Sequence, residues 1–111
     1  MDLKIHQTSI DAIIVIKPLV SVIERFDKDL GKQIRRSATS VPLNIAEGAY
    51  SQGRNRTARF YNALGSAKET CSALQVSAAW GYLDKAQISE CLALYDKVIA
   101  TLYKLINRPS R

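Results

Sequence analysis

Apolar residues recur every three or four positions along almost the whole of this 111-residue chain. That spacing places them on one side of an α-helix, whereas a half-buried strand would alternate apolar and polar residues. Between residues 9 and 27 the apolar positions cover roughly half of the helix circumference, more than one bundle seam requires. The pattern predicts an all-α fold whose first helix is covered on a second side by another subunit or a terminus.

Helix-capping residues divide this pattern into four segments. Either Asp27 or Asp29 can cap the second helix. Gly81 is suited to end the third helix. Asp84, with Gln87 three positions later, is typical of a capping box at the start of the fourth. The predicted helices span about residues 9–27, 29–51, 56–80 and 85–107.

Two prolines fall inside the predicted helices, Pro18 in the first and Pro42 in the second. Each removes one backbone N–H, so a bend or one lost hydrogen bond is expected at each. The connections between helices are short, which favours antiparallel neighbours. The chain is therefore expected to form one domain, residues 1–111, an antiparallel up-down-up-down four-helix bundle.

The net charge of +6 lies in one central part of the chain. Residues 31–68 hold seven basic residues and one acid, Glu47, whereas the remaining bases and acids are nine each. A partner should therefore be sought at this segment.

Composition is that of an ordinary folded chain, with 47 % hydrophobic and 23 % charged residues. No apolar run reaches the roughly 18 residues of a membrane span, and no secretory signal is recognisable. A cytoplasmic location without membrane contact is expected. Cys71 and Cys91 lack CxxC spacing, and His6 is the only histidine, so two reduced, buried thiols are expected, with no metal and no cofactor.

Three stretches carry a family resemblance: QIRRSATSVPLNIAEG at residues 33–48, ARFYNALGSAKET at 58–70 and GYLD at 81–84. Together they resemble the bacterial four-helix-bundle family encoded in 23S ribosomal RNA intervening sequences, over roughly residues 10–107. The matching residues are Gln33, Ile34, Arg35, Arg36, Ser40, Val41, Pro42, Asn44, Ile45, Ala46, Glu47, Gly48, Ala63, Gly65, Ser66 and Glu69. The resemblance implies a left-handed bundle, assembly into a ring-shaped homopentamer and no catalysis.

A more distant similarity in fold and assembly is to the accessory protein of diversity-generating retroelements. That protein is a basic pentameric barrel that engages a reverse transcriptase and nucleic acid. This analogy suggests a nucleic-acid-processing protein as a further partner. The chain departs from its own family pattern after residue 48, where AYSQGRNRTAR contains three arginines and no acid.

The arginines of the central segment are the candidate nucleic-acid-binding residues, since arginine forks match phosphate oxygens bidentately. Exposed tyrosines would add stacking to single-stranded bases. The candidate set is Arg35, Arg36, Arg54, Arg56, Arg59, Tyr50 and Tyr61. The alternative is a solvated basic face that forms ion pairs between subunits or contacts a protein partner, which would make the chain an interaction scaffold.

Asn44 and Glu47 are three positions apart and share one side of the predicted second helix. Near the Pro42 bend they are expected to belong to a structural polar network rather than to a ligand site. Enzyme activity is not expected, because the chain has no second histidine, no paired-carboxylate cluster and no phosphate-binding or nucleophile motif. Two functions remain: binding of RNA or DNA by a basic oligomer, or protein-interaction scaffolding.

Overall fold

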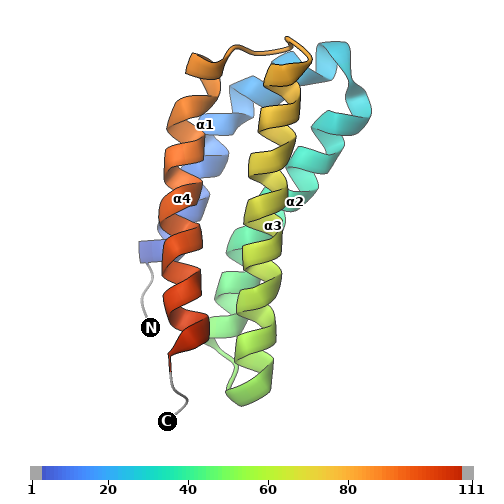
Figure 1. Cartoon of the computed structure of the whole chain (residues 1–111). Coiled ribbons are helices and arrows are strands. Elements are labelled where there is room, and N and C mark those ends of the chain that lie inside the picture. Colours follow the sequence, from blue (N-terminus) through green and yellow to red (C-terminus); the bar gives the residue numbers. More distant parts are fainter. Residues whose placement is uncertain (1–3, 109–111) are drawn as a thin grey trace.

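The computed structural model describes residues 4–108 and consists of four helices. They are α1 (Lys4–Phe26), α2 (Lys28–Ala49), α3 (Gly53–Ala79) and α4 (Lys85–Asn107). Figure 1 shows that successive helices run in opposite directions, and each helix packs against two others in the cyclic order α1, α2, α3, α4. The predicted all-α four-helix bundle is confirmed. It measures 47 × 22 × 19 Å.

Helix α1 begins at Lys4, five residues earlier than expected. The reason is Ile5, which is buried in the core and makes the first turn part of the packed helix. Helix α3 begins at Gly53, three residues earlier than expected. Gly53 has a φ of +58°, a conformation that glycine adopts without steric cost, and it turns the chain from the short connection into the helix.

The helix ends follow the capping chemistry of the sequence. The carboxylate of Asp27 accepts a hydrogen bond of 3.0 Å from the Leu30 N–H at the start of α2. Asp84 and Gln87 form a complete capping box at the start of α4. At the end of α3, Gly81 has a φ of +83°, and the Tyr82 N–H donates to the Ser77 carbonyl at 2.9 Å. This is the Schellman motif that the glycine predicted.

Both prolines lie within continuous helices. Helix α1 continues through Pro18 and α2 continues through Pro42. Pro18 is exposed, whereas Pro42 is buried. Each proline lacks the N–H that would bond to the carbonyl four residues earlier, so both helices continue with that hydrogen bond lost, as one of the two expected outcomes.

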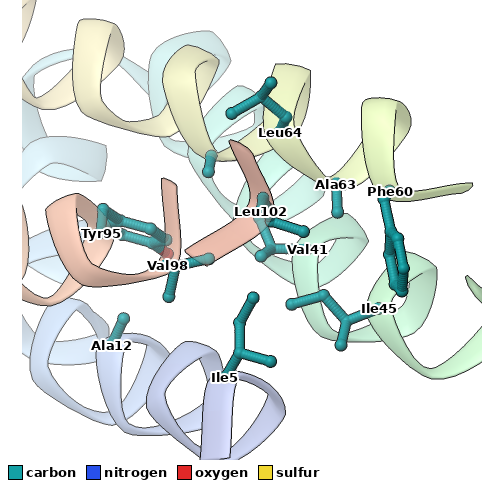
Figure 2. Packing of buried hydrophobic residues seen from close by; sticks show 11 residues of the cluster. Ile5, Ala12, Val41, Ile45, Phe60, Ala63, Leu64, Tyr95, Val98 and Leu102 are labelled. Atoms are coloured by element: carbon teal, nitrogen blue, oxygen red, sulfur yellow. The ribbon is translucent and has the colours of Figure 1, made fainter. Parts of the chain in front are cut away.

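Two hydrophobic clusters form the core, one toward each end of the bundle. Figure 2 shows the cluster nearer the chain termini, where Ile5, Val41, Phe60 and Leu102 come from the four different helices. The second cluster lies nearer the α1–α2 and α3–α4 connections. Its members include Ile23, Ile34, Leu74 and Cys91.

The two cysteines are free thiols. Cys91 is buried and Cys71 is half-buried against the core. Burial raises the pKa of the Cys71 thiol from 9.0 to about 11, and it also raises the pKa of Cys91. Both therefore behave as small hydrophobic residues at neutral pH.

Candidate nucleic-acid interface

The arginines of the central segment do not form one patch. Arg35 and Arg36 lie in the first half of α2, whereas Arg54, Arg56 and Arg59 lie in the first two turns of α3. Figure 1 shows that these turns are at the end of the bundle where α2 finishes and where α4 ends. Twelve residues of helix separate Arg35 from Glu47, the acid that contacts Arg59, and this corresponds to a rise of about 18 Å. The two groups of arginines must be considered separately.

Arg35 is held by an acid of its own chain. Its guanidinium donates two hydrogen bonds to Glu24 of α1, at 2.9 Å and 3.2 Å. These hydrogen bonds lower the pKa of Glu24 and raise the pKa of Arg35. Arg36, in contrast, is exposed and makes no ion pair within residues 4–108. Of this pair, only Arg36 has its guanidinium available for a partner.

The three arginines of α3 have different surroundings. Arg54 is exposed and makes no ion pair in the described part of the chain. Arg59 contacts Glu47 at 3.0 Å, but both side chains are about half exposed, so solvent screens this pair and it contributes little to stability. The Arg56 guanidinium carbon lies 4.9 Å from the centre of the Phe60 ring, in a cation–π contact.

The start of α3 adds to this positive charge. Its first turn contains no acid, and Gln52 at the N-cap makes no side-chain capping hydrogen bond. The positive end of the helix dipole therefore points toward the same region as the three arginines. An anion near this end meets both formal charges and backbone N–H groups.

Both candidate tyrosines are exposed, Tyr50 by 87 % and Tyr61 by 55 %. Tyr50 follows α2 and lines an open hollow of about 430 Å³ together with Arg59. Tyr61 lines a second open hollow, of about 520 Å³, together with Arg54. The structure thus brings the candidates together as two arginine–tyrosine pairs on the surface of α3 and the turn before it.

Asn44 and Glu47 do not share a polar network in the structure. The Asn44 amide donates hydrogen bonds of 2.9 Å to the Ser40 carbonyl and to the Ser40 hydroxyl. The Ser66 hydroxyl of α3 donates to the same Ser40 hydroxyl at 2.8 Å. Asn44 therefore belongs to a polar contact between α2 and α3, whereas Glu47 faces Arg59. The two residues share one side of α2, as the three-residue spacing predicted, but Asn44 bonds to Ser40 whereas Glu47 pairs with Arg59.

Two cations near these arginines were not recognised from the sequence. Lys104, in the last turn of α4, and Arg108, directly after that helix, line one pocket together with Arg56. We call Arg54, Arg56, Arg59, Lys104 and Arg108 the basic end of the bundle. The antiparallel topology could have revealed this grouping, because it places the C-terminus of α4 beside the N-terminus of α3.

Within residues 4–108, no group of three His, Cys, Asp or Glu side chains is arranged to hold a metal ion. None of the four helices is long and apolar enough to cross a membrane. The basic end itself presents guanidinium and ammonium groups beside aromatic rings. These groups bind anions and planar bases.

The fold and this end together define a basic, all-α four-helix bundle. The sequence profile described as 23S rRNA-intervening sequence protein matches residues 1–104. The chain belongs to the 23S rRNA-intervening sequence protein family, as the motif residues indicated.

A solved structure supports the same fold. The chain is similar to the crystal structure of a protein with unknown function from the S23 ribosomal protein family of Bacteroides thetaiotaomicron, with a TM-score of 0.84 and 24 % identity. The similarity covers 94 % of this chain and 99 % of that one. None of the curated proteins compared with the chain matches it.

Proposed function

We propose that this chain binds single-stranded RNA or DNA at its basic end and has a binding role rather than a catalytic one. The observation that carries the proposal is the pairing of exposed arginines with exposed tyrosines, Arg54 with Tyr61 and Arg59 with Tyr50. An arginine binds a phosphate while the neighbouring ring stacks on a base. Single-stranded RNA suits this arrangement better than duplex DNA, because its bases are free to stack.

Assembly would strengthen such binding. The proposed state is a ring-shaped homopentamer, as the family resemblance implies. Five copies of a chain of charge +6 carry thirty positive charges, which favours binding of a polyanion. Exposed aliphatic side chains support assembly: Ile14 is 64 % exposed, Leu43 58 % and Val76 41 %.

Replacement of Arg54 and Arg59 by Gln tests the nucleic-acid interface. Both side chains are exposed, so the fold should be retained. The double variant should bind RNA strands of different sequence more weakly by similar factors. The slope of log affinity against log salt should decrease by about 1.4, since each lost contact with a single strand removes about 0.7.

A matched control is the double variant Lys17→Gln and Arg25→Gln, which removes the same charge from exposed positions of α1. This control should keep nearly the wild-type slope, and the RNA should be recovered uncleaved from all samples. If the wild-type protein shows no salt-dependent binding to RNA or DNA near 50 mM salt, the nucleic-acid proposal is refuted. Equal loss in both double variants would assign the effect to overall charge.

Ile14→Glu tests the assembly. Light scattering should show a wild-type mass several times the 12.3 kDa of one chain and a smaller assembly for the variant. Ser89→Glu adds the same charge at an exposed position of α4, away from the exposed aliphatic side chains, so it should leave the mass unchanged. A wild-type protein of about 12.3 kDa at micromolar concentration would rule the oligomer out.

The scaffold function is the second candidate, and the ion pairs of Arg35 and Arg59 favour it. Both arginines already contact acids of their own chain, as expected of a face that serves packing rather than phosphate binding. Under this alternative the partner is another subunit or a nucleic-acid-processing protein. A ring that dissociates when Arg54 and Arg59 are replaced would assign these residues to assembly.

A further inference from the structure

The basic end contains a pocket of about 370 Å³ that is lined by residues from all four helices. Its floor includes Ile5, Ile45 and Phe60, which are almost fully buried. Figure 2 shows these three side chains converging from α1, α2 and α3. The pocket volume is near the lower limit of small-molecule sites, which range from about 300 to 1,000 Å³. It suits one small ligand rather than a duplex.

Three cations line this pocket: Arg56 of α3, Lys104 of α4 and Arg108, the residue that follows α4. No carboxylate is among the lining residues, and none of the three cations makes an ion pair within residues 4–108. Three cations that lack a counter-charge repel one another, so a bound anion would relieve the repulsion. Guanidinium and ammonium groups together are typical of phosphate recognition.

Arg56 also determines the shape of the ligand that fits. Arg56 as a whole residue is half-buried. Its guanidinium carbon lies 4.9 Å from the centre of the Phe60 ring. This cation–π contact places Arg56 beside an aromatic ring at the wall of the pocket. Because a guanidinium group is planar, Arg56 can also stack on a planar group of a ligand, such as a nucleobase.

We infer that this pocket binds a nucleoside 5′-phosphate, with Lys104 and Arg108 on the phosphate and Arg56 against the base. The ligand is either a free mononucleotide or the 5′-phosphorylated terminal nucleotide of a strand. The strand form rests on the proposed function, whereas the free form does not. In the strand form, the pocket holds the end of the strand, and the open arginine–tyrosine surfaces of α3 contact the nucleotides that follow.

The test compares two strands of one RNA sequence, which differ only in a 5′-phosphate or a 5′-hydroxyl, in binding to the full chain. Fluorescence anisotropy should show at least about tenfold tighter binding of the phosphorylated strand, the factor expected for one charge-assisted contact pair. Calorimetry with adenosine 5′-monophosphate and with adenosine provides the second arm. It should show binding of the phosphate form alone.

Lys104→Gln with Arg108→Gln should abolish the preference for the phosphate, bringing the affinity ratio of the two strands to about one. Lys85→Gln with Lys97→Gln is the matched control, since it removes the same charge from exposed positions of α4 that do not line the pocket. This control should keep the preference. All four positions are exposed, and the comparison of ligands on the wild-type protein is decisive by itself if a variant folds poorly.

Binding of the mononucleotide without a preference among strands would identify the free nucleotide as the ligand. Equal affinity for both strands, together with no heat from the mononucleotide, would overturn the inference, as would a preference that survives Lys104→Gln with Arg108→Gln. The proposed function fails separately, through loss of salt-dependent strand binding. Salt-dependent strand binding with no preference for the 5′-phosphate and no binding of the mononucleotide would therefore refute the inferred nucleotide site and leave the proposed function intact.

Discussion

Gly48 and Gly65 provide a stringent test of how tightly α2 and α3 are packed. Both are helical glycines with negative φ, but their surroundings differ. A Cβ atom at Gly48 would lie 2.6 Å and 2.7 Å from two carbons of the Phe60 ring. A Cβ atom at Gly65 would have no atom within 4 Å apart from its chain neighbours and the backbone of its own helix. An alanine side chain therefore fits at position 65, whereas at position 48 it collides with the Phe60 ring.

The expected free energies of unfolding follow from two opposing effects. Replacing a helical glycine by alanine stabilises by about 0.8–1 kcal/mol, so Gly65→Ala should be more stable than the wild-type protein. Gly48→Ala has at most the same gain, and forcing an extra methyl group against Phe60 costs about 1–3 kcal/mol. Gly48→Ala should therefore be about 1–3 kcal/mol less stable than Gly65→Ala.

Urea denaturation at one fixed protein concentration measures this difference, because stability depends on concentration if the chain assembles. A difference below about 0.5 kcal/mol would show that the Phe60 ring moves aside freely, and the reasoning from close packing would be wrong. Phe60→Leu shortens the opposing side chain, so Gly48→Ala should cost less in that background. A double-mutant cycle should show coupling of about 1 kcal/mol.

Other expectations concern single groups. Asp84→Ala removes the capping box of α4 and should cost about 1 kcal/mol in unfolding free energy, whereas Asp84→Asn should retain most of it. Tyr95→Phe removes a buried hydroxyl that lacks a hydrogen-bond partner, so chemical denaturation should show no loss, and a loss above about 2 kcal/mol would indicate an unrecognised partner. The Cys71 pKa is raised from 9.0 to about 11, so the folded chain binds more protons than the unfolded chain in this window. Its contribution to stability is complete below pH 9 and decreases toward pH 11, and Cys71→Ala should make the melting temperature less dependent on pH in that range.

Local chemistry explains why most of the bundle could be predicted from the sequence. The capping box at Asp84 and the glycine at position 81 act through residues three or four positions away, so their effect is visible along the chain. The start of α1 was missed because it depends on a distant contact. Ile5 is buried by packing with other helices.

The grouping of the candidate binding residues, in contrast, depends on packing between residues far apart in the sequence. The amino-acid order indicated a strongly basic segment, but charge along a chain says nothing about which charges meet in space. Packing separated Arg35 from the α3 arginines and paired it with Glu24, a residue outside the segment. Packing also added Lys104 and Arg108, because antiparallel helices place the end of α4 beside the start of α3.

The helical type of the four segments, and the helix ends marked by capping residues, follow from periodicity and caps, which are properties of neighbouring residues. The pocket at the basic end is a property of four helix ends that meet. Its buried apolar lining comes from Ile5, Ile45 and Phe60, and its charge comes from α3, α4 and the residue that follows α4. Periodicity shows which side of a helix is buried but not which helix lies against it, so a site built across four helices emerges only when the helices pack.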